Sequence, residues 1–378
     1  MELAGPQRPI AREMAFLVAL CRARITGVAA LPPEDPDWNR LFSLAEDHQL
    51  LPLVWQPLLQ TRIPPTLLRA LARRQSMHTR RSLLFLSELR RIVRALDEIG
   101  IPSVSFKGPL LAMQLYGDCA QRYFTDLDLK VDPSHFTEAS AVLNELGYTS
   151  EAEEPSAGFN KYEQSMFIHG ELGVAVELHR ALMPNYFVSR PLASNLHFET
   201  IFGYPICTLS RESNLIYLAA HGAKHAWSIL SWLADFAQIA NGEGIENSKL
   251  DILSRKAGGS EPLQLAFALA DRVFSLRLNR HNISSSMRIE RFAAKQAHRL
   301  LSIPFKGASL WEQLRTGVVV AANSYRAARY VAAASLIPAE IDFASASLPR
   351  TLWPLYYPLR IGRLAKQSVH NLVSEVLP

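Results

Sequence analysis

Two aspartates separated by one leucine lie in the segment RYFTDLDLKVD, residues 122–132. Its alternation of polar and apolar residues predicts a β-strand, in which residues two positions apart share a face. Asp126, Asp128 and Lys130 therefore point to one side, and the leucines between them point to the core. The strand rise places the two aspartate Cα atoms roughly 6.5–7 Å apart, so their carboxylates can converge on one cation. Mg²⁺ prefers such oxygen ligands, and binding it would offset the cost of burying the two charges.

A third carboxylate occurs in the segment VAVELHR, which also alternates. Glu177 and His179 share one face of this expected strand, and valines occupy the other face. If the two strands are neighbours, three carboxylates meet on one sheet face and repel one another unless a cation is present. A two-metal site would resolve that repulsion and supply phosphoryl or nucleotidyl transfer chemistry. The alternative is that Asp126 and Asp128 lie at a solvent-exposed strand edge, because a D-x-D pattern alone is common.

The turn FKGPLL, between an expected strand and an expected helix, is a candidate phosphate site. A helix N-terminus offers free N–H groups and the positive end of the helix dipole to an anion. Gly108 would let the backbone approach a phosphate closely, and Lys107 could contact that phosphate. Arg122 could steady either the carboxylates or a phosphate. Taken alone, the turn also fits an ordinary strand-to-helix connection, and a lone arginine also fits the protein surface.

A pair of histidines forms a further candidate site. His221 and His225 are four residues apart on an expected helix and so share a face, to which Lys224 is adjacent. Three interpretations are open: a buried structural pair, contacts to an acceptor or a nucleotide, and a metal site. The last lacks the glutamate of the H-E-x-x-H zinc motif, because position 222 is a glycine. His179, beside the third carboxylate, is another candidate for acceptor or nucleotide contact.

The elements that would hold these residues fall into three stretches. Before residue 100, apolar residues recur at helical spacing and predict helices over 12–30, 36–60 and 66–99. A compact α/β unit follows, in which strands alternate with helices. Its expected elements are 101–106, 107–117, 124–131, 132–147, 161–169 and 173–179. After residue 210 the pattern is helical again, with one or two helices over 212–240 and more helix to about residue 335.

These stretches predict an α+β fold, with a small mixed β-sheet core and mainly α-helical N-terminal and C-terminal regions. The expected divisions are a helical region over 1–99, the α/β core over 100–205 and a second helical region over 206–340. A tail over 341–378 is rich in proline, aromatics and arginine.

Composition favours a globular protein with a sizeable core. The 378 residues are 48% hydrophobic and carry a net charge of +5, which permits a nucleotide or nucleic-acid partner without requiring one. The three cysteines are too far apart for a metal motif or a disulfide framework, so we expect them in the core. No stretch near the N-terminus resembles a signal peptide, and no apolar run is long enough to span a membrane. We therefore expect a cytoplasmic protein.

The order of these motifs resembles the DNA-polymerase-β-type nucleotidyltransferase superfamily. The order is KG, a helix, R…DLDL, a helix that ends in LGY, and then VELH, and it covers about residues 95–240. The likeness is greatest to a bacterial branch of nucleotidyltransferases with long helical flanks. The segment HGAKHAWSILSWLADFAQI is similar to the His-rich helix of that family. The superfamily usually has Gly-Ser or Gly-Gly in the turn, whereas here Pro109 follows Gly108.

The resemblance implies an enzyme, namely a metal-dependent nucleotidyltransferase. It implies that Asp126 and Asp128 hold two catalytic Mg²⁺ ions and that Glu177, the third carboxylate, helps to activate the attacking hydroxyl. Gly108 would begin the helix that faces the triphosphate. The reaction would move an NMP group from an NTP such as ATP to an acceptor and release pyrophosphate. The acceptor would be a small molecule, a protein or RNA, although no basic stripe with interleaved aromatics calls for a nucleic acid.

Other functions fit parts of the pattern. A haloacid-dehalogenase-type phosphatase also uses D-x-D, but Lys130 stands where threonine or valine is normal in that class. A glycosyltransferase D-x-D would lack the large nucleotide-binding domain upstream. A catalytically degenerate nucleotidyltransferase-like domain, acting as a binding or scaffold module, is favoured by Pro109, which has no N–H for a phosphate. The intact acids argue against that module.

Overall fold

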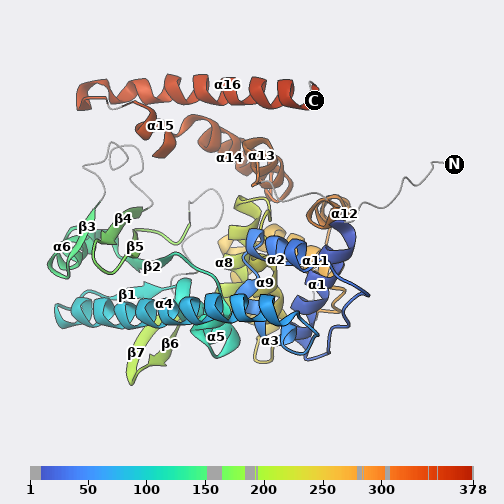
Figure 1. Ribbon diagram of the computed structural model, residues 1–378. Coiled ribbons are helices and arrows are strands. Elements are labelled where there is room, and N and C mark those ends of the chain that lie inside the picture. Colours follow the sequence, from blue (N-terminus) through green and yellow to red (C-terminus); the bar gives the residue numbers. More distant parts are fainter. Residues whose placement is uncertain are drawn as a thin grey trace.

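The computed structural model describes residues 10–150, 164–183, 192, 195–278, 283, 285–302, 307–338, 340–346 and 348–376. Within them, a mixed sheet of seven strands lies beside a large helical region, so the fold is α+β, as the sequence predicts (Figure 1). The strand order is β3-β4-β5-β2-β1-β7-β6. The strands are β1 Ser103–Ser105, β2 Asp126–Val131, β3 Tyr148–Ser150, β4 Gln164–His169, β5 Val174–His179, β6 Leu196–Ile201 and β7 Tyr204–Leu209.

Helices precede the sheet, connect its strands and follow it. The first group is α1 Ile10–Thr26, α2 Trp38–Asp47, α3 Leu51–Leu58, α4 Pro65–Glu98, α5 Gly108–Tyr116 and α6 Phe136–Glu145. The second group is α8 Arg211–Lys224, α9 Leu230–Asn241, α10 Asn247–Ala257, α11 Ser260–Phe274, α12 Met287–Ser302, α13 Leu310–Val319, α14 Ser324–Leu336, α15 Glu340–Ser345 and α16 Tyr356–Val376. Among the described residues, no helix has both the length and the apolar sequence that a membrane span requires.

Several segments differ from the sequence prediction, among them the short strand β3, which was not expected. The single helix expected over 36–60 is wrong, because Gln49 has a φ of +56° and divides that stretch into α2 and α3. Strands β6 and β7 were not expected; they form a hairpin whose turn residues Phe202 and Gly203 both have positive φ, as a tight two-residue turn requires. For the tail, 341–378, the sequence analysis described only the composition and no secondary structure. In the structure, most of this tail is the helix α16. Residues 161–163 lie outside the described residues, and the rest of the expected strand 161–169 is β4.

The central strand β2 separates an apolar face of the sheet from a polar one. It runs parallel to β5 and antiparallel to β1. Leu127, Leu129 and Val131 are at most 1% exposed and share one core with Phe85 and Leu89 of α4. The long helix α4 crosses the sheet on this side, and α6 belongs to the same core (Figure 1). The alternating leucines therefore pack on the core, as predicted.

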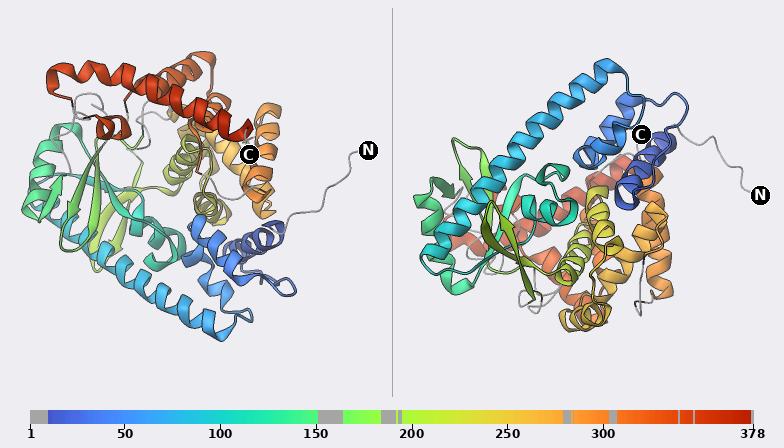
Figure 2. Two further views of the ribbon diagram at one scale, coloured as in Figure 1. Left: turned by 45° about the horizontal axis from the view of Figure 1, so that its top comes forward. Right: turned by 90° about the horizontal axis from the view of Figure 1, so that it is seen from below.

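A second core joins helices that precede the sheet to helices that follow it. Met14 of α1 is fully buried in the same cluster as Phe236 of α9 and Trp227. Cys21, expected as a core residue, is also fully buried there. Helix α1 packs against α9, α11 and α12, so the first and the later helices form one region beside the sheet (Figure 2).

The connection between α8 and α9 depends on a close contact between Trp227 and Gly222. Ala226 and Trp227 both have a positive φ, near +50°, which turns the chain back on α8. The Trp227 ring then lies against Gly222, where an added Cβ would come within 2.5 Å of ring atoms. The glycine at position 222 is therefore required by packing, and Trp227 is a core residue.

Gly222→Ala should lower the free energy of unfolding by about 2 kcal/mol, because overpacking against a buried ring outweighs the higher helix propensity of alanine. Urea denaturation of the full chain measures the change. Gly170→Ala is the matched control, since a Cβ at Gly170 meets nothing within 4 Å. Equal stabilities of the two variants would contradict the proposed contact.

Candidate active site

The parallel pairing of β2 with β5 brings the sequence-predicted carboxylates onto one sheet face. In this register Asp126 lies opposite Ala175, and Asp128 lies opposite Glu177. The side chains point away from α4, because the leucines of β2 occupy that side. The expectation that these two strands are neighbours is confirmed.

Asp128 is a buried carboxylate that is held by two hydrogen-bond donors. Its Oδ1 lies 2.6 Å from Lys107 Nζ and 3.2 Å from His179 Nε2, and the residue is 1% exposed. Its Oδ2 is buried and has no hydrogen-bond partner among the described residues. Burial acts to raise the pKa of Asp128, but Lys107 and His179 together hold that pKa below its ordinary value. The carboxylate is therefore ionised at neutral pH.

The raised pKa of Asp126 reflects its burial and the repulsion between the three carboxylates. Asp126 is half-buried, and burial together with the charges of Asp128 and Glu177 raises the pKa of Asp126 to about 6. Lys107 and Arg122 oppose the rise without cancelling it. A cation bound between the carboxylates would remove the repulsion.

His179 links two of the acids. Its Nε2 lies 3.2 Å from Asp128 Oδ1 and 3.2 Å from Glu177 Oε2. Burial acts to lower the pKa of His179, but its hydrogen bonds to both carboxylates raise that pKa above its ordinary value. The imidazole also packs edge-on against Phe106, with ring centroids 5.0 Å apart. His179 is thus oriented by its neighbours and donates toward both acids.

The turn before α5 brings Lys107 to the carboxylates. Gly108 has a φ of +54°, and a Cβ there would lie 3.1 Å from the carbonyl oxygen of Asp126. The glycine therefore lets the first turn of α5 lie directly on β2, so that Lys107 reaches Asp128. The sequence predicted a close approach at Gly108 to a phosphate, whereas the structure shows a close approach to the neighbouring strand.

A cavity of about 230 Å³ opens onto this face of the sheet. Most of the sequence-predicted site residues line it. They are Lys107, Asp126, Glu177 and His179 on the sheet side and His221, Lys224 and His225 on the α8 side. The structure thus brings the histidine helix and the carboxylates together, although they are far apart in the sequence.

On the α8 side, histidine and tryptophan rings lie close together, and the two histidines are uncharged. The ring of His221 lies 4.8 Å from that of His225 and 5.1 Å from that of Trp232. Burial, followed by the charge of Lys224, lowers the pKa of His225 to about 3, and burial lowers the pKa of His221 well below its ordinary value. Both imidazoles are therefore neutral at pH 7 and can each donate and accept a hydrogen bond.

Arg122, predicted to contact the nucleotide, has a different partner in the structure. Its Nε lies 2.7 Å from Asp235 Oδ2 of α9, and Tyr116 Oη donates to Asp235 Oδ1 at 2.7 Å. Arg122 is 9% exposed and does not line the cavity. This buried ion pair fixes the segment that precedes β2 to the helical region.

The donor atoms at the site fit a divalent cation. Asp128, Glu177 and His179 each offer one ligand atom, and these atoms lie within 4.8 Å of one another. The unpartnered Oδ2 of Asp128 provides a further oxygen at the same place. Carboxylate oxygens suit Mg²⁺ or Mn²⁺, and an imidazole nitrogen is more typical of transition metals. Asp126, which the sequence placed among the metal ligands, lies outside this closest group.

Sequence reasoning missed several residues at the site. Tyr217 and Gln164 line the cavity, and Phe106 packs edge-on between His179 and Tyr217, with centroid distances of 5.0 and 5.3 Å. Tyr217 lies four residues before His221 on one helix face, a spacing that could have identified it. Gln164 begins a neighbouring strand and had no such signal.

Comparisons with known proteins give one family match. A family model described as uncharacterised nucleotidyltransferase matches residues 34–275, about two thirds of the chain. None of the curated proteins matches. Among solved structures, the solution structure of the antibiotic-resistance factor ANT(2'')-Ia is similar at 15% identity and a TM-score of 0.33, over 45% of this chain and 89% of that chain. A likeness at this level says nothing about what the present chain binds.

Lys107→Met should lower the free energy of unfolding by about 3 kcal/mol, because it leaves the buried Asp128 charge without its closest partner. Adding Asp128→Asn should restore most of the loss. Chemical denaturation of both variants measures this coupling. Lys295→Met, at an exposed position of α12, is the control, and an equally small effect of Lys107→Met would show that the ion pair contributes little.

The neutral histidines should make the protein sensitive to acid. The pKa of His225 is lower in the folded protein than in the unfolded chain, so the unfolded chain binds the proton at a higher pH. Protonation therefore favours unfolding, and the free energy of unfolding falls as the pH drops below about 6.5. His225→Gln should reduce the loss between pH 7 and pH 5 by about 2 kcal/mol. Urea denaturation at the two pH values measures it. The unmodified chain is the control, and an equal loss of stability in His225→Gln would refute the assignment.

Proposed function

Because the chain belongs to a family of uncharacterised nucleotidyltransferases, we propose that its cavity transfers a nucleoside monophosphate from an NTP to an acceptor and releases pyrophosphate. The reaction depends on a divalent metal, for which Mg²⁺ is the first candidate. The acceptor is a small molecule, a protein or RNA. Nothing in the cavity selects among these three classes.

The observation that carries the proposal is that Asp126, Glu177 and the Lys107 ammonium group line the cavity, with the buried Asp128 beside them. Asp126, Asp128 and Glu177 come from adjacent parallel strands, and Lys107 comes from the turn beside them. The raised pKa of Asp126 and the unpartnered Oδ2 of Asp128 both indicate a place that a cation would stabilise. A purely structural cluster would rely on Lys107 and Arg122, which oppose the rise in the pKa of Asp126 without cancelling it.

The chain would perform the transfer as follows. The acceptor hydroxyl attacks the α-phosphorus, an oxygen–phosphorus bond forms, and the bond from that phosphorus to the oxygen of the leaving pyrophosphate breaks. Glu177, at the cavity wall, is placed to take the proton of the hydroxyl, and His179 hydrogen-bonds to Glu177 and so orients it. A divalent metal held by Asp126, Asp128 and Glu177 would neutralise charge on the phosphates.

The remaining groups would bind and orient the substrates. Lys107 and Lys224 offer positive charge to the triphosphate from opposite sides of the cavity. The neutral imidazoles of His221 and His225 can hydrogen-bond to a base or to the acceptor. Arg122 does not reach the cavity, and through its ion pair with Asp235 it positions the strand that carries the aspartates.

One observation favours a second candidate, a catalytically degenerate domain that acts as a binding or scaffold module. Lys107 Nζ lies 2.6 Å from Asp128 Oδ1 and so takes a position that a bound cation could occupy. In addition, Pro109 removes one N–H from the helix turn that would face a triphosphate. Turnover separates the two candidates, because both could bind a nucleotide.

The experiment is incubation of the full chain with Mg²⁺ or Mn²⁺ and each α-labelled NTP, with protein, RNA and small-molecule acceptors added in turn. Asp126→Asn and Asp128→Asn should each reduce label transfer roughly a thousandfold, because metal-held phosphate charge is worth several kcal/mol in the transition state. Glu138→Gln, at an exposed position of α6, is the matched control and should retain full transfer.

Retained transfer in an Asp126→Asn/Asp128→Asn protein would reject the proposed site. Metal-dependent NTP binding without any transfer, over all three acceptor classes, would favour the binding module. Absence of both transfer and metal-dependent NTP binding would reject the transferase and favour the degenerate scaffold module.

A further inference from the structure

The C-terminal helix α16 reverses the usual arrangement of apolar and charged side chains. A helix on the surface of a globular protein normally packs its apolar side on the protein and turns its charged side to water. In α16, Arg360 and Arg363 instead point inward to the buried carboxylate of Asp342. Arg360 Nη1 lies 3.0 Å from Asp342 Oδ2, and Arg363 Nε lies 2.5 Å from Asp342 Oδ1. The charged side of this helix therefore faces the protein.

Large apolar side chains remain exposed on and just before this helix. Leu359 and Ile361 of α16 are 41% and 51% exposed. Leu352 and Leu355, in the 3-10 helix Arg350–Leu355 that precedes α16, are 44% and 47% exposed. Figure 1 shows α16 along the outer edge of the molecule, with α14 and α15 on its inner side. Single exposed leucines are common, whereas four large apolar side chains in one short segment indicate a surface that an apolar partner covers.

The charges of the same segment have one sign. Between Asp342 and Glu375 the sequence contains no acidic residue. The basic residues in that interval are Arg350, Arg360, Arg363 and Lys366. Lys366 is exposed and, seven residues after Leu359, lies on the same side of the helix as that leucine. The segment thus combines exposed apolar side chains with positive charge.

We propose that the outer side of α16, together with the preceding 3-10 helix, binds the surface of a membrane that contains anionic lipids. The helix would lie in the plane of the membrane surface, with Leu359 and Ile361 at the boundary between head groups and acyl chains. Lys366 would then lie at the level of the lipid phosphates. Such a surface matches both features of the segment, because it offers an apolar layer and negative charge together.

Two other occupants match only one of these features. A second copy of the chain would cover the apolar side chains, but it would bring two segments without acidic residues face to face, and their like charges would oppose the pairing. A nucleic acid would pair with the basic groups and leave Leu359 and Ile361 without an apolar partner. Helix α16 also lies outside residues 34–275, which the family model matches, so the membrane proposal does not rest on the transfer reaction.

The test is co-sedimentation of the full chain with unilamellar vesicles, without metal or NTP. One set of vesicles is phosphatidylcholine alone, and the other is phosphatidylcholine and phosphatidylglycerol in equal parts. We expect roughly tenfold tighter binding to the mixed vesicles, because basic side chains are attracted to an anionic surface. Added salt should weaken that binding, since it screens the attraction.

Two variants separate the apolar contribution from the charge. Ile361→Glu should weaken binding to the mixed vesicles by about tenfold or more, because a carboxylate replaces an apolar side chain that the membrane would bury. Lys366→Glu should weaken binding to the mixed vesicles and leave binding to phosphatidylcholine unchanged. Both side chains are exposed, so neither change disturbs a core.

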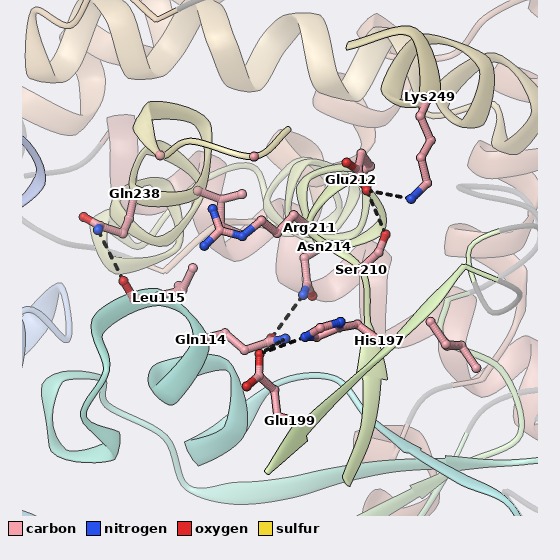
Figure 3. A pocket seen from close by; sticks show the side chains of 14 residues that line it. Gln114, Leu115, His197, Glu199, Ser210, Arg211, Glu212, Asn214, Gln238 and Lys249 are labelled. Atoms are coloured by element: carbon pink, nitrogen blue, oxygen red, sulfur yellow. Dashed lines mark hydrogen bonds and ion pairs between the residues drawn. The ribbon is translucent and has the colours of Figure 1, made fainter. Parts of the chain in front are cut away.

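Ile252→Glu is the matched control. Ile252 is 53% exposed on α10, where basic and acidic side chains pair with each other. Arg255 pairs with Asp251, and Lys249 Nζ lies 3.3 Å from Glu212 Oε2 (Figure 3). This variant should bind vesicles as the unmodified chain does.

Equal binding to the two kinds of vesicle, or no binding to either, would overturn the proposal. So would unchanged binding in Ile361→Glu or an equal loss in Ile252→Glu. A dimer that light scattering detects and that Ile361→Glu dissociates, without any binding to vesicles, would assign the surface to a second copy of the chain instead.

Discussion

The buried charge of Asp128 is the constraint on which the rest of the site depends. An ionised carboxylate at the centre of a sheet is tolerated only if donors are held against it, and here Lys107 and His179 meet the same oxygen. Each donor has its own support: Lys107 is delivered by the turn at Gly108, and His179 by the adjacent parallel strand and the Phe106 ring. Fold and site are therefore linked, because moving either element would leave the charge uncompensated.

The two faces of the sheet have different roles. The apolar face packs against α4 and α6 and stabilises the strands, whereas the polar face opens toward α8. Arg122 and Asp235 connect these parts through a buried ion pair, so the loop before β2 cannot shift independently of α9. The arrangement holds the carboxylates between the core of the sheet and the helical region.

Much of the sheet side of the site could be predicted from the sequence, because strict alternation fixes which side chains share a face. The alternation around Asp126 and Asp128 was sufficient to place both carboxylates on one face. Adding Glu177 to that face required only that the two strands be neighbours. The partner of Arg122 could not be predicted, because Asp235 lies far away in the sequence and nothing local selects it. The hairpin β6–β7 was missed although its two-residue turn ends in Gly203, a recognisable signal.

The packing of α1 against α9, α11 and α12 has a consequence for biosynthesis. Helix α1 is made before the sheet, but its contacts with α9, α11 and α12 can form only after the whole sheet has been synthesised. Such long-range contacts form late, because a long loop must close before they can be made. Late closure slows folding and prolongs the exposure of apolar surface. During translation, α1 can pack against α2 and α3 first, and the face of α1 that meets α9, α11 and α12 stays uncovered until those helices have been made.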